Sequence, residues 1–277
     1  MKLYKTKTGI IVEYKQAYYL LPSADWDEII NRPQAYNGLL TGIQNLQPVS
    51  NAGMLLQELL VPIGTQELWA AGVTYLRSKE ARMEESKDSG GATFYDKVYD
   101  AERPEIFFKA NAYKIMPHKG QVRIRKDSDW NVPEPELTLV VNKTGEIVGY
   151  TIGNDMSSRS IEGENPLYLP QAKMYDGSAA VGPCVLMTEQ PIDPSTLISI
   201  TIIRNEVTVF EGSVTIDKMK RKHTELVEFL YREYSFSTGA YLMTGTCVVP
   251  GNDFTLQAGD EVQITISGIG QLINTVA

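Results

Sequence analysis

Two glutamates, Glu134 and Glu136, lie two residues apart at the start of an apolar run that is typical of a β-strand and ends at Val141. Side chains of a strand alternate between its two faces, so both glutamates project to the same side. Like charges that close repel each other, and a nearby cation is needed to keep both ionised. This pair therefore constrains the fold most, because it calls for a strand whose acidic edge meets a cation.

A second apolar, β-branched run follows and ends at Asp155. In a hairpin with a two-residue turn at Thr144-Gly145, Lys143 would face Glu146, and counting outward brings Asp155 opposite Glu134. Directly opposed residues share a face of the sheet, so three carboxylates would converge on one spot. A turn one residue longer or shorter would shift this register.

Three converging carboxylates have two interpretations. A solvated acidic edge is what an isolated Glu-x-Glu usually is. The apolar setting of both strands, and the absence of a compensating Lys or Arg on the same face, favour instead a hard divalent cation held by three oxygens.

Length and charge bound the class of protein. The chain has 277 residues, near the upper size of one hydrophobic core, so we expect a large domain of residues 66–277 and a small domain of residues 1–65, separated near Pro62-Ile63-Gly64. The net charge of −8 disfavours nucleic acid as a partner. The chain contains neither a signal peptide at its start nor a run approaching the ~20 apolar residues of a membrane span. We therefore expect a soluble, cytoplasmic protein without nucleic-acid or membrane partners.

Hydrophobic patterning predicts the elements of both domains. In the first 65 residues we expect three short strands and two helices, over residues 3–4, 9–14, 17–21, 25–31 and 34–42. The larger domain should begin with a buried strand (67–75) and a charged helix (76–86), followed by a polar segment (87–93) that is a mobile lid or a disordered tip. Further strands are expected at 120–126, 197–204, 207–210, 241–249, 261–267 and 271–276, which indicates a closed or rolled sheet.

Some polar residues are expected to be structural. Cys184 and Cys247 lie in apolar strand-like runs and should be reduced core residues. His118 and His223 lack the His or Cys neighbours of a zinc site. Glu105 and Lys109 bracket an apolar run, and one of the two should be an ordinary surface charge.

Several ordered motifs together resemble the fumarylacetoacetate hydrolase superfamily. Pro133-Glu134-Pro135-Glu136-Leu137 resembles its paired-glutamate strand, and residues 149–159 resemble its third-ligand segment. Thr244-Gly245-Thr246 and the stretches 259–262 and 268–274 resemble its closing strands. The resemblance spans residues 67–277 and implies an α+β fold, a mixed β-sandwich roll with a small N-terminal α/β appendage.

The same resemblance implies a metal site and a pair of acid/base residues. It assigns Glu134, Glu136 and Asp155 to Mg²⁺, with Mn²⁺ or Ca²⁺ as other ions suited to oxygen ligands, and places Glu105 and Lys173 beside the substrate. It implies a homodimer or a dimer of dimers as the assembly.

Two further residues are implied as substrate-binding. Thr246 matches a family threonine that contacts the substrate carboxylate, and Arg159 matches a family arginine. Tyr75 and Tyr168 are candidates for the lining of the site, and Tyr75 is counted with the substrate-binding residues, although tyrosines in apolar runs are more often core residues with a satisfied hydroxyl. Two residues depart from the hydrolases of the family: Ser78 stands where they carry a histidine base, and Glu162 where they tend to carry glutamine. The segments around Glu105 and Lys173 instead resemble the branch that dehydrates 2-keto-3-deoxy-arabinonate.

The predicted activity is therefore that of a Mg²⁺-dependent dehydratase, a hydro-lyase. Its substrate would be a 2-keto-3-deoxy sugar acid such as 2-keto-3-deoxy-D-arabinonate, and its product 2-oxoglutarate semialdehyde, formed through a metal-stabilised enolate. Either Lys173 or Glu105 is the base and the other the acid; burial near a cation should leave the lysine partly deprotonated. The simpler role for Lys173 is that of a counter-ion to the acidic cluster.

Two alternatives remain open. A hydrolase, decarboxylase or tautomerase of an acylpyruvate or related diketo acid would use the same metal-stabilised enolate with a different base and leaving group. A catalytically silent homologue would keep the metal site and the fold for assembly only. A panel of 2-keto acids separates all three.

Overall fold

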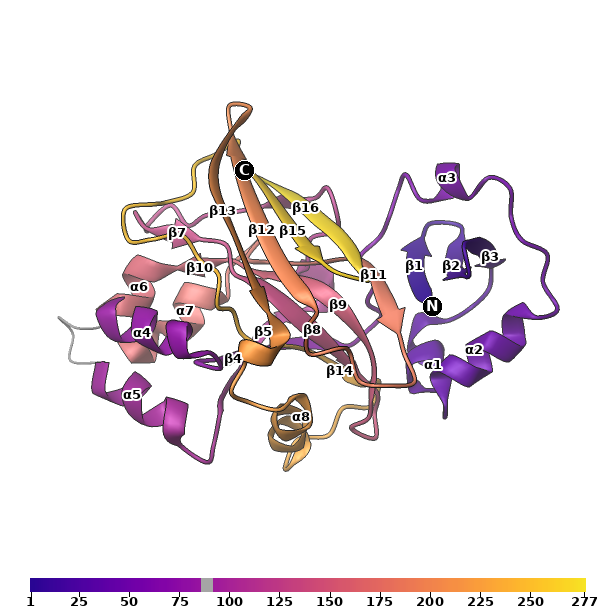
Figure 1. Ribbon diagram of the computed structural model, residues 1–277, viewed down its shortest axis with the longest axis horizontal. Helices are drawn as coiled ribbons and strands as arrows, with labels where there is room; N and C mark the ends of the chain where they lie inside the picture. Colours follow the sequence, from indigo (N-terminus) through magenta and orange to yellow (C-terminus); the bar gives the residue numbers. More distant parts are fainter. Residues whose placement is uncertain (86–91) are drawn as a thin grey trace.

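The computed structural model describes residues 1–85 and 92–277 (Figure 1). Its helices are α1 (Trp26–Asn31), α2 (Ala35–Ile43), α3 (Ala52–Leu55), α4 (Leu76–Glu85), α5 (Ala92–Asp100), α6 (Arg159–Glu164), α7 (Leu169–Lys173) and α8 (His223–Tyr231). Its strands are β1 (Lys2–Thr6), β2 (Gly9–Tyr14), β3 (Ala17–Leu21), β4 (Glu67–Gly72), β5 (Glu105–Asn111), β6 (Gln121–Val122), β7 (Asn131–Val132), β8 (Pro135–Val141), β9 (Ile147–Asp155), β10 (Ser157–Ser158), β11 (Ala179–Met187), β12 (Leu197–Arg204), β13 (Val207–Thr215), β14 (Ala240–Met243), β15 (Glu261–Ile266) and β16 (Gly270–Val276).

Two packed sheets form the body of the molecule. A nine-stranded sheet has the order β3-β2-β1-β11-β9-β8-β14-β4-β5, and a five-stranded sheet has the order β13-β12-β15-β16-β6. Leu137 and Leu139 of the first sheet pack with Ile200 and Ile264 of the second in one buried cluster. Burial of each such side chain contributes about 1.5–3 kcal/mol. The predicted mixed β-sandwich is confirmed; the described residues contain no closed barrel.

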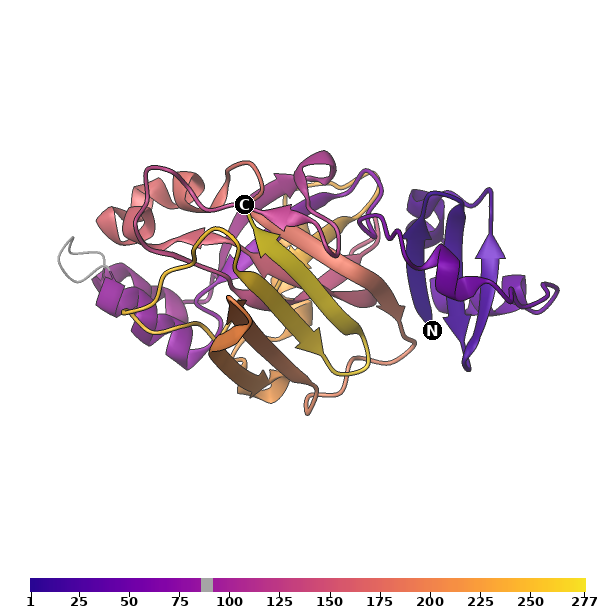
Figure 2. The ribbon, with the colours of Figure 1, turned by 90° about the horizontal axis from the view of Figure 1, so that it is seen from above.

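The small N-terminal unit lies at one end of the molecule (Figures 1 and 2) and continues the larger sheet. β1 pairs antiparallel with β11, where Leu3 faces Val185. On the sheet face away from the second sheet, Trp26 and Ile30 of α1 belong to the same apolar cluster as Tyr241 of β14. The division into residues 1–65 and 66–277 remains our proposal, and a shared strand pairing and a shared core join the two parts.

The Tyr241 hydroxyl joins the small unit to the sheet. It accepts a hydrogen bond from Trp26 Nε1 at 3.2 Å and donates one to the Pro62 carbonyl at 2.6 Å, in a fully buried position. We expect Tyr241→Phe to lower the free energy of unfolding by about 1–3 kcal/mol, because two buried polar groups lose their partner. Urea denaturation measures this; an unchanged midpoint would mean that the network does not join the parts.

The hairpin that carries the acidic residues differs from the predicted one in two places. Asn142, not Lys143, pairs with Glu146, so the loop has three residues instead of two. Farther along, Val141 pairs with Ile147 but Val140 pairs with Gly149, which leaves Val148 as the extra residue of a bulge. The longer loop shifts the register by one residue and the bulge restores it, so Asp155 does lie opposite Glu134.

Other predicted elements hold in part. The strand expected at 241–249 ends at Met243, and the strand expected at 120–126 contains only Gln121 and Val122. Cys247 consequently lies in a half-buried loop and not in the core, whereas Cys184 is buried as predicted. Of the expected lid at 87–93, residues 87–91 lie outside the described residues, and the last two residues begin α5. No helix of the described chain is long and apolar enough to cross a membrane.

Candidate active site

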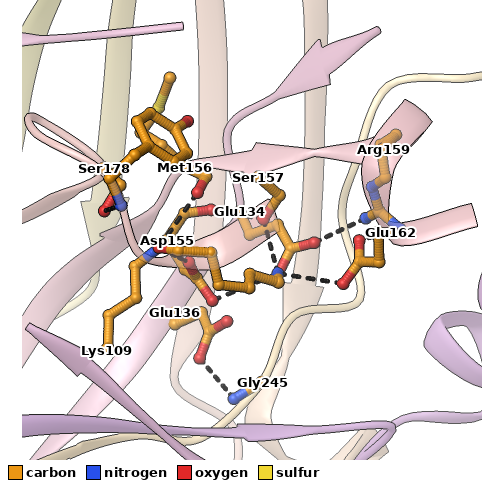
Figure 3. Close-up of polar contacts among 12 residues, drawn as sticks. Lys109, Glu134, Glu136, Asp155, Met156, Ser157, Arg159, Glu162, Ser178 and Gly245 are labelled. Carbon is orange, nitrogen blue, oxygen red and sulfur yellow. Dashed lines mark hydrogen bonds and ion pairs between the residues drawn. The ribbon is translucent and has the colours of Figure 1, made fainter. Parts of the chain in front are cut away.

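The acidic residues gather (Figure 3) where two neighbouring central strands of the nine-stranded sheet, β8 and β9, begin and end. Glu134 directly precedes β8, Glu136 is its second residue, and Asp155 ends the neighbouring β9. Their carboxylate oxygens lie within 4.8 Å of one another, and the three residues are 4%, 1% and 1% exposed. The predicted convergence is therefore confirmed. No other group of three possible metal ligands occurs among the residues whose side chains the structure describes.

Buried cations surround the three carboxylates. Lys173 Nζ, from α7, donates to Glu134 Oε2 at 2.8 Å and to Asp155 Oδ2 at 3.3 Å. Arg159, from α6, donates to Glu134 Oε1 at 2.7 Å, and Lys109 of β5 pairs with Asp155 Oδ1. The expectation that no Lys or Arg compensates the acidic face was wrong. The two acidic strands contain no Lys or Arg, but β5, α6 and α7 each bring a cationic side chain to the carboxylates.

The surroundings shift the pKa values of Glu134 and Glu136 in opposite directions. Burial would raise the pKa of Glu134, but the charges of Lys173 and Arg159 outweigh burial and lower the pKa to about 2. Burial, followed by the charges of Asp155 and Glu134, raises the pKa of Glu136 well above its ordinary value. Glu136 also accepts a hydrogen bond from the Gly245 amide at 2.5 Å. In the metal-free protein, Glu136 is thus the carboxylate that most needs an added positive charge.

A further buried carboxylate, Glu162 of α6, extends this network (Figure 3). It forms an ion pair with Arg82 of α4 and lies 3.7 Å from Lys173 Nζ and 3.8 Å from Arg159. The sequence marked Glu162 only as a departure from related hydrolases. Its role as a partner of three cations follows from α4, α6 and α7 meeting over the site, which no local pattern indicates.

Glu105 and Lys109 are both part of the site, so the expectation that one is a surface charge was wrong. Lys109 is 1% exposed. The Glu105 residue as a whole is only half-buried, but its Oε2 is buried and has no hydrogen-bond partner in the described part of the chain. Burial raises the pKa of Glu105, against the opposing charge of Arg82. The acid/base role of Glu105 stays a prediction.

Lys173 does not show the expected tendency to lose its proton. Burial lowers its pKa, but the charges of Asp155, Glu134 and Glu162 outweigh burial and raise the pKa above the ordinary value. Ser157 Oγ also accepts a hydrogen bond from Lys173 Nζ at 2.5 Å. In the metal-free protein, Lys173 is an ammonium group.

Glu105 reaches the site only because Gly72 faces it across the β4–β5 ladder. A Cβ atom at Gly72 would lie 1.9 Å from Glu105 Oε2. We expect Gly72→Ala to displace that carboxyl and lower kcat by at least about 10-fold, since even an error of ~1 Å can cost about 100-fold. Gly42→Ala is the matched control, because nothing lies within 4 Å of its added Cβ. Normal turnover by Gly72→Ala would show that the position of Glu105 is unimportant.

A cavity opens beside the carboxylates. Its lining includes Glu134, Asp155, Arg159, Lys173, Arg82, Phe107, Val73, Thr246, Cys247 and Val249. Thr246 Oγ1 is buried and has no hydrogen-bond partner among the described residues, so it is available to a ligand. Tyr75 is 1% exposed and lies behind this lining, and Tyr168 is 38% exposed. The substrate-binding roles of Thr246, Arg159 and Tyr75 stay predictions.

Two unusual backbone turns shape the cavity wall. Val73 has φ of 54°, in the left-handed region that a β-branched residue rarely adopts, and Gly245 has φ of 94°. Thr74 Oγ1 donates to the Thr244 carbonyl at 2.7 Å and ties the two turns together. Conformations of this kind persist only where the surroundings impose them, and they concentrate at functional sites. The Val73 turn is not visible in the sequence, because valine carries no turn signal.

Both histidines lie outside the site. Nδ1 of His118 accepts a hydrogen bond from the Ile273 amide at 3.2 Å, and His223 is the first residue of α8. Their expected structural character agrees with these positions.

The residues present fit a divalent cation. Hard cations such as Mg²⁺ prefer carboxylate oxygens, and the trio offers three that are close together and shielded from water. Five carboxyl groups (Glu105, Glu134, Glu136, Asp155 and Glu162) face four cationic groups of low exposure (Arg82, Lys109, Arg159 and Lys173), and the exposed Arg77 also lines the cavity. Without Arg77 the net formal charge is −1, which favours an added cation.

Comparison with known proteins identifies the class. The family model described as "Fumarylacetoacetate (FAA) hydrolase C-terminal" matches residues 76–277. The chain belongs to this family, and the predicted resemblance is confirmed.

Particular relatives point to one branch of the family. The chain is 50% identical over 217 residues to "Probable 2-keto-3-deoxyxylonate dehydratase" of Haloferax volcanii, covering 78% of this chain and 74% of the relative. It is 45% identical over 217 residues to "2-dehydro-3-deoxy-D-arabinonate dehydratase" of Saccharolobus solfataricus, covering 78% and 73%. A solved structure, "2-keto-3-deoxy-D-arabinonate dehydratase complexed with magnesium and 2,5-dioxopentanoate", superposes with a TM-score of 0.84 at 35% identity, covering 100% of this chain and 98% of the other.

Proposed function

We propose that this protein is a Mg²⁺-dependent dehydratase of 2-keto-3-deoxy sugar acids. It removes water from a five-carbon acid such as 2-keto-3-deoxy-D-arabinonate and gives 2-oxoglutarate semialdehyde, which is 2,5-dioxopentanoate. The observation that carries the proposal is the buried trio of Glu134, Glu136 and Asp155 with Lys173 and Glu105 beside it. The names of relatives at 45–50% identity describe this chemistry.

Glu134, Glu136 and Asp155 would hold the ion. When bound, Mg²⁺ supplies Lewis-acid polarisation of the 2-keto group, which makes the C3 protons more acidic. The three carboxylates and their cationic neighbours are almost fully buried, so bulk water screens them little and the electrostatic interactions among them are strong.

The reaction needs a base at C3 and an acid at the C4 hydroxyl. Glu105 is our base, because its raised pKa makes it a stronger base than an ordinary glutamate and its Oε2 has no partner among the described residues. Lys173 is our acid, because its neighbours keep it an ammonium that donates hydrogen bonds.

The proposed dehydration removes one molecule of water from the substrate. Glu105 removes a C3 proton, the C4–O bond breaks, and Lys173 protonates the departing hydroxide. The resulting unsaturated keto acid carries a C5 hydroxymethyl group. Transfer of a proton from C5 to C3 gives an enol with a double bond between C4 and C5. Tautomerisation of this enol moves the C5 hydroxyl proton to C4 and leaves an aldehyde at C5, so no oxidant or reductant is required.

Two cavity residues are proposed to bind the substrate. Thr246 offers a buried hydroxyl without a partner, and Arg159 offers a guanidinium beside the acidic trio. Tyr75 is proposed as a support of this wall, since its side chain is fully buried behind the cavity.

The test is a substrate panel with purified protein and added Mg²⁺. It contains both C4 epimers of 2-keto-3-deoxy-pentonate and an acylpyruvate, with aldehyde formation and C–C cleavage measured separately. We expect aldehyde from a pentonate and no cleavage of the acylpyruvate. C–C cleavage of the acylpyruvate without aldehyde formation from a pentonate would favour the hydrolase alternative. Metal binding without turnover of any substrate would favour a catalytically silent homologue.

We further propose a cytoplasmic homodimer, or a dimer of dimers, as the working form. Both cysteines are free, which suits a reducing compartment, and closed symmetric assemblies are common among enzymes. Light scattering of the eluted protein measures the assembly; a monomer at catalytic concentration would contradict it.

A further inference from the structure

Lys109 occupies an irregular position in its strand. In the ladder of β4 and β5, Leu68 pairs with Ala110 and Trp69 pairs with Phe108, which leaves Lys109 as the extra residue of a bulge. Bulges of this kind re-aim side chains and are common next to active sites. The bulge sends a long charged side chain into the interior, where it is fully enclosed.

Three oxygens of the protein surround the Lys109 ammonium. Nζ donates hydrogen bonds to the Met156 carbonyl at 3.0 Å and to the Lys173 carbonyl, and it forms an ion pair with Asp155 Oδ1 (Figure 3). This ion pair lacks the geometry of a hydrogen bond, since Asp155 Oδ1 has no hydrogen-bond partner among the described residues. Lys109 is also not among the residues that line the cavity. Its ammonium is therefore held by groups of the protein and does not face the cavity.

Lys109 differs in this respect from the other lysine of the site. Lys173 Nζ instead contacts side chains of the described residues, namely Glu134, Asp155, Ser157, the more distant Glu162 and the Phe107 ring. Two of the three partners of Lys109 are main-chain carbonyls, which cannot move without moving the fold. The two buried lysines thus divide Asp155 between them, with Lys109 on Oδ1 and Lys173 facing Oδ2.

We propose that Lys109 is a positioning residue that aims Asp155 and anchors Lys173. By holding Oδ1 it leaves Oδ2 as the oxygen that Asp155 presents to a cation. By binding the Lys173 carbonyl it fixes the end of α7, from which the acid side chain extends. This inference rests on the proposed function, and it competes with a plain counter-ion role for Lys109.

The experiment compares Lys109→Met with Lys5→Met. Lys5 is a half-buried lysine on β1 that donates to the Ile63 carbonyl, far from the site in sequence and in the sheet order. We expect Lys109→Met to weaken Mn²⁺ affinity about 10- to 100-fold in calorimetry without substrate, as loss of a partner of a metal ligand does. At saturating Mn²⁺ we expect kcat to fall by a similar factor while KM changes little. Lys5→Met should change neither quantity.

A plain counter-ion gives a different result. It would lower the thermal stability of Lys109→Met but leave Mn²⁺ affinity and kcat at their original values, and that outcome overturns the proposal. If Lys109→Met does not fold, a crystal structure of the unsubstituted protein with Mn²⁺ decides. We expect Lys109 Nζ to remain within about 3.2 Å of Asp155 Oδ1 with the ion on Oδ2. A displaced Lys109, or both Asp155 oxygens on the ion, would overturn it.

The proposed function and the role of Lys109 are tested by different measurements. If the proposed function is wrong, the unsubstituted protein forms no aldehyde. The role of Lys109 is decided by the metal affinity of Lys109→Met and by the position of Asp155.

Discussion

Glu136→Gln is expected to abolish metal binding while making the metal-free protein more stable near neutral pH. Metal affinity should fall by more than about 100-fold, because even partners of metal ligands contribute about 10- to 100-fold. Glutamine keeps the shape of the side chain and can still accept the hydrogen bond from Gly245. The fold should therefore persist, and turnover should be lost with the ion.

The stability effect has a definite pH window. Burial, and then the charges of Asp155 and Glu134, raise the pKa of Glu136 in the folded state above its ordinary 4.5. Below the ordinary pKa, both folded and unfolded chains carry the proton. As the pH rises from there through the raised pKa, the unfolded carboxyl ionises freely and the folded one does not, so folding loses free energy. Glu136→Gln removes this loss.

Urea denaturation without metal at pH 5 and pH 8 measures the effect. The unsubstituted protein should lose more stability between these values than Glu136→Gln does. Glu211→Gln, at an exposed strand position on β13, is the matched control and should follow the unsubstituted protein. A Glu136→Gln protein that still binds Mn²⁺ tightly would remove this residue from the metal site.

Glu105→Gln and Lys173→Met are expected to lose turnover by about 100- to 10,000-fold each and to keep the metal, because each removes one proton-transfer group. The two variants should differ in a partial reaction. Exchange of C3 protons with D₂O needs only the base, so it should vanish in Glu105→Gln and continue in Lys173→Met. Proton NMR of bound pyruvate or of the pentonate, with Mg²⁺ present, follows this exchange.

Lys114→Met is the control for the lysine variant, since it removes a charge from an exposed pair with Asp176. Exchange that is lost in Lys173→Met and kept in Glu105→Gln would reverse the assignment of base and acid. Full turnover in both variants would place the proton transfers on other residues. Metal affinity, measured in each variant, separates a lost proton transfer from a lost ion.

Local patterns predicted the acidic strand and its partner well. The alternation around Glu134 and Glu136, and the second apolar run ending at Asp155, were sufficient to bring the three carboxylates together. The turn itself was predicted with the wrong length. The register was nevertheless right, because the bulge at Val148 offsets the extra loop residue, and neither feature has a strong sequence signal.

The cationic half of the site was not predictable in the same way. Lys109 and Lys173 are 64 residues apart in sequence, and Arg82 and Glu162 are farther still, yet each pair meets in the site. A charged residue in an apolar run is most often solvated, so burial could not be inferred for Lys109. The family resemblance supplied Lys173 and Glu105 but not the partners that set their protonation.

Local sequence was enough to predict which oxygens meet, because strand alternation and hairpin pairing are rules that act over about 20 residues. The cations that face those oxygens, and the protons that these groups hold, follow from the three-dimensional packing, because a pKa depends on burial and on charges that arrive from distant segments. In this protein β5, α6 and α7 bring Lys109, Arg159 and Lys173 to a site that β8 and β9 had already defined.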